Sequence, residues 1–204
     1  MGQIASSGRF IALLKDFEGY ANWLYLNDQD AVTVGAGLTF PDADSLVRSA
    51  IRFRFALHAR NAGGDDVRAE FKRIAVAQKG MSAIRYKRIA LLRADENHLL
   101  GVLRKRIQEA QFSAEMFYNT GPEIANSAFR KFDDLPLNVR YALVDMAFTL
   151  GRRQLMKYQE LRRLLKMGDW AKAARESHRY GASSKRNQSV YQWISQNEAV
   201  KSLS

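Results

Sequence analysis

One glutamate and the polar residues that follow it have the residue types that acid–base chemistry needs. Glu18 ends an apolar stretch, and Asn27, Asp28 and Thr33 follow it closely in the chain. A carboxylic acid in apolar surroundings has a raised pKa and can protonate a leaving oxygen near neutral pH. A second carboxylate, or a polar group that holds a water molecule, completes the requirements for cleaving a glycosidic bond. Glu18 is therefore the candidate general acid.

A short helix and a β-hairpin are expected to position these residues. Apolar residues recur at helical spacing over 8–17, and Gly19 is a suitable helix stop. Residues 20–40 combine β-prone runs with the turn-rich tetrapeptide 27–30, which predicts a β-hairpin and the only sheet expected in the chain. Thr33 lies across this hairpin, where its hydroxyl could orient a water molecule.

The rest of the chain is expected to be helical, because it contains few prolines. Asp44 is expected to cap a helix that ends near Gly63 and Gly64. Asp65 or Asp66 is expected to cap the helix that follows. Residues 86–92 have a mixed pattern. Further helices are expected from 95–96, over 137–150, over 155–167, from Asp169–Trp170 to Gly181, and from Ser183 or Ser184. The predicted fold class is α+β and mainly helical, with a small hairpin lobe and a helical lobe.

The composition restricts the partners and the chemistry. Thirty-two Lys and Arg against 21 Asp and Glu give a formal charge of +11, which favours anionic partners such as nucleic acid, membrane surfaces or the bacterial envelope. The chain has no cysteine, which excludes disulfides and thiolate catalysis. No apolar run is long enough for a membrane span, and the N-terminus lacks a signal-peptide pattern. His58, His98 and His178 are scattered, so no metal and no cofactor are expected.

Two separated blocks of the sequence resemble the phage-type (T4-type) lysozyme family. The first block is Phe17-Glu18-Gly19, then Tyr25, then Thr33-Val34-Gly35-Ala36-Gly37, at that family's spacing of glutamate and threonine. In the second block, residues 137–151 resemble the central helix of the C-terminal lobe. Residues 169–174 resemble a tryptophan-bearing helix start, and residues 183–187 a loop that ends in an arginine.

The resemblance implies a single lysozyme-like domain over 1–204 with two lobes. The hairpin lobe would cover about 15–92, with an extra helical insertion over 42–92 that has no assigned counterpart. A linking helix would cover about 95–110, and a helical lobe about 111–204 together with the N-terminal helix. Glu18 would be the general acid. Tyr25, Phe148, Thr149 and Arg186 would bind substrate, with Arg186 also pairing with Glu18.

The sequence departs from the family pattern at its second catalytic position. That pattern has an aspartate or cysteine nine residues after the glutamate, where this chain has Asn27. Three interpretations of this departure remain open. Asp28 or Asp30 takes the second catalytic role through a shifted turn, or Asn27 and Thr33 only position the water molecule and Glu18 is the one essential carboxylate. In the third interpretation, the enzyme is weakened or inactive. Leu38 also replaces a structural histidine of the family.

The function that the resemblance implies is a muramidase that cleaves between N-acetylmuramic acid and N-acetylglucosamine with inversion. It would be made in the cytoplasm as a monomer and act in the periplasm or cell wall, as a phage endolysin or a secreted antibacterial effector. Its partner is peptidoglycan, with an immunity protein or secretion chaperone possible at 42–92, no nucleic acid and no membrane insertion. The alternatives are a non-catalytic peptidoglycan-binding relative and a basic helical nucleic-acid-binding protein.

Overall fold

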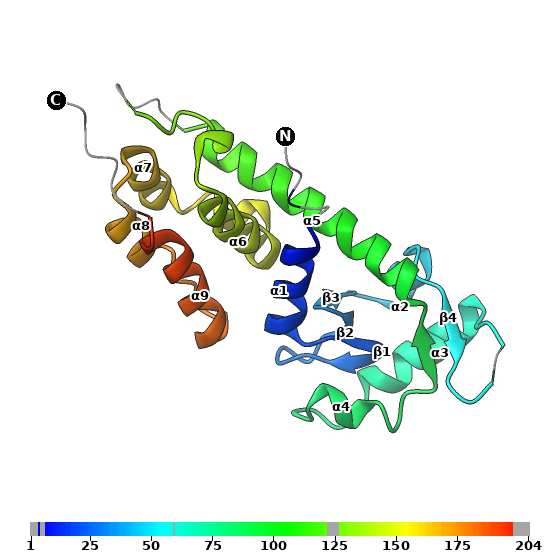
Figure 1. Ribbon diagram of the computed structural model, residues 1–204. Coiled ribbons are helices and arrows are strands. Elements are labelled where there is room, and N and C mark those ends of the chain that lie inside the picture. The colour runs from blue at the N-terminus through cyan, green and yellow to red at the C-terminus, as the bar shows by residue number, and fades with distance from the viewer. Residues whose placement is uncertain (1–3, 5–6, 59, 122–126, 198–204) are drawn as a thin grey trace. The chain divides into compact units, whose positions relative to one another are not determined.

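The computed structural model describes residues 4, 7–58, 60–121 and 127–197, and the side chain of Glu18 is outside what it describes. The described chain is α+β and mainly helical, with two small antiparallel sheets (Figure 1), as the sequence predicts. It divides into two compact units. We call Ile11–Lys105 the hairpin unit, and Met1–Phe10 together with Arg106–Ser204 the helical unit.

A short helix leads into the three-stranded sheet of the hairpin unit. The helix is α1 (Gly8–Glu18), and the strands are β1 (Ala21–Leu26), β2 (Val32–Gly35) and β3 (Leu38–Thr39). The strands are antiparallel in the order β1-β2-β3, with Tyr25 opposite Thr33 and Thr33 opposite Thr39. The predicted helix and hairpin are confirmed, and the sheet gains a third strand.

The segment after this sheet contains the helix that was expected from Asp65 or Asp66, but not the long helix that was expected from Asp44 to Gly63 and Gly64. It contains α2 (Ala43–Arg48), β4 (Phe53–Phe55), α3 (Gly64–Ala75), α4 (Ala83–Tyr86) and β5 (Leu92–Ala94). Asp42, not Asp44, caps α2 and accepts a hydrogen bond from the Ser45 N–H at 2.6 Å. The helix prediction was wrong because Ile51, Phe53 and Phe55 alternate at the period of a strand, and β4 pairs with β5.

A buried carboxylate ties α3 to β5. Glu70 is 3% exposed and accepts hydrogen bonds from the backbone N–H groups of Leu91 at 2.8 Å and Leu92 at 3.3 Å. Arg73, one turn further along α3, pairs with the same carboxylate. This pairing satisfies a charge that would be costly to bury alone, so it holds the chain in place where β5 begins.

The helical unit is built from helices whose caps the sequence identified in part. They are the part of α5 (Glu96–Asn119) from Arg106 onward, the 3-10 helix η2 (Phe132–Asp134), α6 (Leu137–Leu155), α7 (Gln159–Met167), α8 (Trp170–Glu176) and α9 (Ser184–Ser195). Asp169 caps α8 and Ser183 caps α9, both as predicted. However, α8 ends at Glu176, not Gly181.

The C-terminal end of α6 also differs from its predicted limit. The helix α6 extends past residue 150 to Leu155, with a kink at Gly151, where φ is 70°. Glycine adopts this left-handed conformation with little strain. The following helix therefore begins at Gln159, several residues later than predicted.

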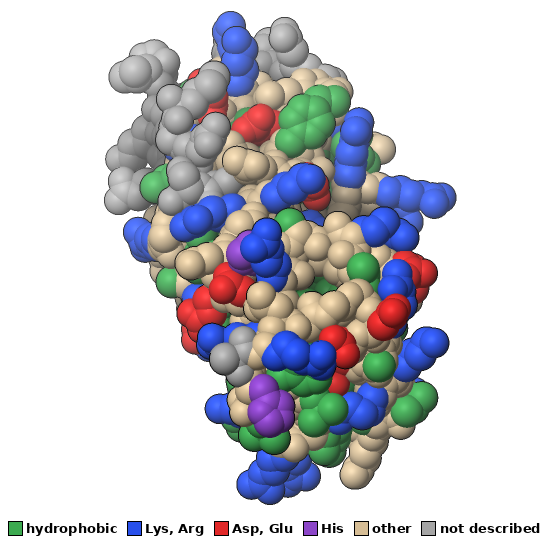
Figure 2. Space-filling model, turned by 90° about the vertical axis from the view of Figure 1, so that its right-hand side faces the viewer, with side chains coloured by type: hydrophobic (Ala, Val, Ile, Leu, Met, Phe, Trp, Pro, Cys, Tyr) green, Lys and Arg blue, Asp and Glu red, His purple; other side chains and the backbone are tan. Residues whose placement is uncertain are grey.

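The face of the molecule drawn in Figure 2 carries its positive charge in a dispersed form. On the face drawn in Figure 2, Lys and Arg side chains are scattered, with Asp and Glu side chains between them. None of the helices in the described part of the chain has the length and apolar character needed to cross a membrane.

Candidate active site

The candidate acid lies where α1 meets the sheet. Glu18 is the last residue of α1, and Gly19 follows it with φ of 70° before β1 begins at Ala21. The left-handed conformation of Gly19 turns the chain sharply from the helix into the strand. The sequence therefore places the Glu18 backbone directly beside the start of the hairpin.

Asn27 closes the turn between β1 and β2. Its Oδ1 accepts hydrogen bonds from the N–H groups of Gln29 and Ala31, both at 3.0 Å. This is an Asx-type turn, in which a side-chain oxygen satisfies backbone donors that the strands cannot reach. The Asn27 oxygen is thus used to shape the turn, so the simplest role of this residue is to hold the neighbouring carboxylates in place.

The two aspartates of the turn have different surroundings. Asp28 is exposed and forms no ion pair with any described residue. Asp30 has φ of 56°, and its carboxylate lies 2.8 Å from Nζ of Lys79. Lys79 comes from the segment with no counterpart in the resemblance, and its pairing with Asp30 was not predicted. Asp28 is therefore the acidic side chain of this turn that is available to a ligand or a water molecule.

Thr33 is fully buried in β2, and its hydroxyl has partners inside the sheet. The hydroxyl donates to the Ala31 carbonyl at 2.9 Å and lies 3.3 Å from the Thr39 hydroxyl. Tyr25, its partner across β1 and β2, is also buried. Thr39 is exposed at the sheet surface, so it connects Thr33 to solvent. No sequence pattern predicted this second hydroxyl.

A second polar cluster lies within the helical unit and is centred on Asp145. This residue is fully buried on α6, where its Oδ2 lies 2.8 Å from Nη1 of Arg179 and its Oδ1 lies 2.6 Å from Nη2 of Arg186. Burial lowers the pKa of Arg179, and the Asp145 carboxylate acts in the opposite direction. The signal for this cluster was a lone acid inside the buried run 141–147, which requires a charged partner.

Phe148 and Thr149 follow this cluster on α6. Phe148 is half-buried, whereas Thr149 is exposed. The Thr149 hydroxyl donates to the Asp145 carbonyl at 2.8 Å and accepts from Nη1 of Arg179 at 3.1 Å. Thr149 therefore links the buried charges to the surface of the helical unit, and its hydroxyl can still accept a hydrogen bond from a ligand.

The structure brings the predicted residues together in two groups. Asn27, Asp28 and Thr33 share one hairpin that begins just after Glu18. Thr149 and Arg186 share the cluster around Asp145. The expected pair between Arg186 and Glu18 stays a prediction, because the Glu18 side chain is not described. Among the described residues, no group of three His, Asp or Glu side chains could hold a metal ion.

Comparison with known proteins gives no further indication of function. No protein-family model matches the chain, and no curated protein matches it either.

Proposed function

We propose that this protein is a peptidoglycan hydrolase of the muramidase type with a lysozyme-like fold. The observation that carries the proposal is the position of Glu18. It is the last residue of α1, and β1 of the hairpin begins at Ala21. In this hairpin Tyr25 lies opposite Thr33. This arrangement suits a proton donor on one element and a water-binding turn on the next. The sequence blocks over 137–151 and 183–187 support the same proposal independently.

In the proposed mechanism, Glu18 protonates the leaving glycosidic oxygen and Asp28 activates the attacking water. Inversion requires the two carboxyl groups to be far enough apart for that water, about 6.5–9.5 Å. Asp28 is assigned this role because Asn27 shapes the turn and Asp30 pairs with Lys79. Asn27 and Thr33 then act as positioning residues within the hairpin unit.

The decisive experiment compares Glu18→Gln with a matched glutamate on another helix. Glu109 is exposed on α5 and provides the control variant Glu109→Gln. Loss of general acid catalysis is expected to lower the rate of peptidoglycan hydrolysis about 100-fold or more, while the control keeps the wild-type rate. Release of reducing ends from purified sacculi measures both. Wild-type activity in Glu18→Gln would overturn the proposal.

The second candidate is a wall-binding protein without catalysis. The observation that favours it is the structural use of the Asn27 amide, which leaves Asp28 as the turn's only carboxylate without a described ion pair. In this case the wild type would sediment with sacculi and release no reducing ends, and Asn27→Asp would not create activity. An active wild type would exclude this candidate.

A further inference from the structure

The segment over 72–93, which we call the basic segment, has an unusual charge pattern that the proposed active site does not use. It contains no Asp or Glu and seven cations, which are Lys72, Arg73, Lys79, Arg85, Lys87, Arg88 and Arg93. Some of these cations have partners within the hairpin unit, since Arg73 pairs with Glu70 and Lys79 with Asp30. Arg85, Lys87 and Arg88 are exposed, and none forms an ion pair with a described residue.

The outer part of the basic segment, residues 83–93, is a fixed part of the hairpin unit. Tyr86 is fully buried, and its hydroxyl donates to the Gln78 carbonyl at 2.7 Å. The indole N–H of Trp23 in β1 donates to the Ala83 carbonyl at 2.8 Å. The segment therefore presents its outward side chains from an anchored backbone, with little ordering needed when they bind a partner.

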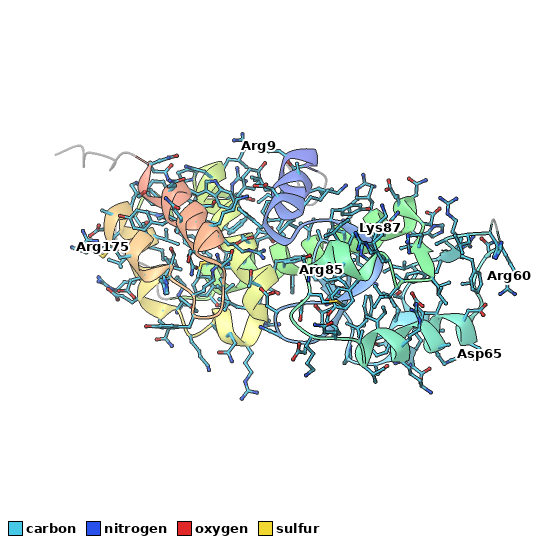
Figure 3. The ribbon with its side chains drawn as sticks, turned by 90° about the horizontal axis from the view of Figure 1, so that it is seen from below. Arg9, Arg60, Asp65, Arg85, Lys87 and Arg175 are labelled. Atoms are coloured by element: carbon cyan, nitrogen blue, oxygen red, sulfur yellow. The ribbon has the colours of Figure 1, made fainter. Side chains whose placement is uncertain are left out.

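Those outward side chains are of two kinds. Ile84, Ile89 and Leu91 are 60%, 37% and 52% exposed. The others are the exposed cations Arg85, Lys87 and Arg88, of which Arg85 and Lys87 are labelled in Figure 3. Arg93 is half-buried and donates to backbone carbonyls. Tyr86 is the one uncharged polar side chain of residues 83–93, and it is buried. The exposed side chains of this stretch are therefore cations and aliphatic groups, together with Ala83.

We propose that residues 83–93 dock the hairpin unit on the surface of an anionic phospholipid bilayer. The cations attract the headgroup phosphates, and the aliphatic side chains enter the boundary of the acyl region. A protein partner is less well matched, because residues 83–93 expose no amide, hydroxyl or aromatic side chain. Nucleic acid is less well matched because exposed aliphatic groups add nothing to phosphate binding.

The test measures sedimentation of the full chain with vesicles, which does not depend on hydrolytic activity. The vesicles contain phosphatidylglycerol and phosphatidylcholine in equal parts, and pure phosphatidylcholine vesicles serve as the neutral comparison. Each cation near an anionic surface contributes about fivefold in affinity. The combined change Arg85→Gln, Lys87→Gln and Arg88→Gln is therefore expected to weaken binding about 100-fold.

A second triple variant controls for net charge. Arg104, Lys105 and Arg106 are exposed on α5, and their change to Gln removes the same charge outside the basic segment. This control is expected to weaken binding far less, and Ile84→Ser with Leu91→Ser should weaken it with the cations intact. Equal loss in the two triple variants, equal binding to neutral vesicles, or no effect of the serine changes would overturn the proposal. Binding to heparin that is as tight as binding to anionic vesicles, with no effect of the serine changes, would indicate a polyanion site instead.

Discussion

The guanidinium of Arg186 lies beside the carboxylate of Asp145, with Nε 3.0 Å from both carboxylate oxygens and Nη2 2.6 Å from Oδ1. Arg179 contacts the same carboxylate, and its own side chain is fully buried. Three charged groups are thus enclosed between α6 and the chain around α9. Charged groups removed from water remain favourable only while they are paired and hydrogen-bonded.

The first prediction concerns the removal of the Asp145 charge. Asp145→Asn leaves two guanidinium groups without this buried carboxylate, so the free energy of unfolding should fall by about 3–5 kcal/mol. For a chain of this size the thermal midpoint should fall by about 10 °C. Asp133→Asn is the control, because Asp133 pairs with Arg140 at 3.6 Å and is half-exposed, and it should change stability by less than about 1 kcal/mol. Similar losses in the two variants would contradict the central role of Asp145.

The second prediction separates the structural and catalytic roles of Asn27. Asn27→Ala removes the acceptor of two turn hydrogen bonds, which should destabilise the protein by about 1–2 kcal/mol. Asn27→Asp keeps that acceptor and adds a carboxylate at the position where the pattern of the lysozyme family that the sequence resembles has an aspartate or cysteine. It should retain wild-type stability and raise peptidoglycan hydrolysis. Thermal unfolding and release of reducing ends measure the two effects, and a destabilised Asn27→Asp would argue against the turn assignment.

The third prediction compares two glycines of the hairpin unit that should respond with opposite signs. Gly35 has φ of 67°, and an added Cβ would lie 3.0 Å from Cδ1 of Leu99. Gly35→Ala should therefore cost about 2–4 kcal/mol through backbone strain and overpacking. Gly101 lies within α5 with nothing within 4 Å of an added Cβ, so Gly101→Ala should stabilise the helix by about 0.5–1 kcal/mol. Denaturant unfolding tests the pair, and a neutral Gly35→Ala would refute the predicted contact.

The fourth prediction concerns alkaline pH. Burial raises the pKa of Tyr118 well above its ordinary value of 10.0, and Asp134 adds to this effect. The folded state therefore keeps the phenol protonated at pH values where the unfolded chain ionises. The associated stability is fully present below about pH 10 and is lost as the pH rises further.

Tyr118→Phe should reduce this alkaline loss. The thermal midpoint of the wild type should fall more between about pH 8 and pH 11 than that of the variant. The variant also loses the hydrogen bond to the Phe129 carbonyl at 2.8 Å, so it should be less stable at the lower pH. Tyr180 is 94% exposed, and Tyr180→Phe should follow the wild type at both values. Identical pH dependence in wild type and Tyr118→Phe would contradict this account.

The elements that the sequence predicted well are those with a local physical signal. Gly19 ends α1 in the left-handed conformation, and Asp169 and Ser183 cap helices through their own side chains. Each of these features depends on a few neighbouring residues. The β4–β5 pair was missed because it joins residues 53–55 to residues 92–94, which are distant in the chain. In addition, the alternation of Ile51, Phe53 and Phe55 covers too few residues to distinguish a strand from a helix.

The site could be predicted from sequence to a similar extent. The positions of Glu18, Tyr25 and Thr33 around one hairpin followed from spacing along the chain. The ion pair of Asp30 with Lys79 and the contacts of Asp145 with Arg179 join distant segments. Their cause is the fold that encloses them. The lone acid in the apolar run 141–147 indicates that Asp145 needs a charged partner, but no pattern of neighbouring residues indicates which residue supplies it.

The helical unit includes the N-terminal residues as well as the second half of the chain, and this has a consequence for synthesis. Phe10 packs against Tyr141 with ring centroids 5.4 Å apart, and Ser7 is hydrogen-bonded to the Tyr141 hydroxyl at 3.1 Å. On the ribosome, the hairpin unit is complete once Lys105 has emerged. Ser7 and Phe10 find these partners only after α6 has been made. During translation the hairpin unit can therefore fold before Ser7 and Phe10 take their places in the helical unit, although these two residues precede it in the chain.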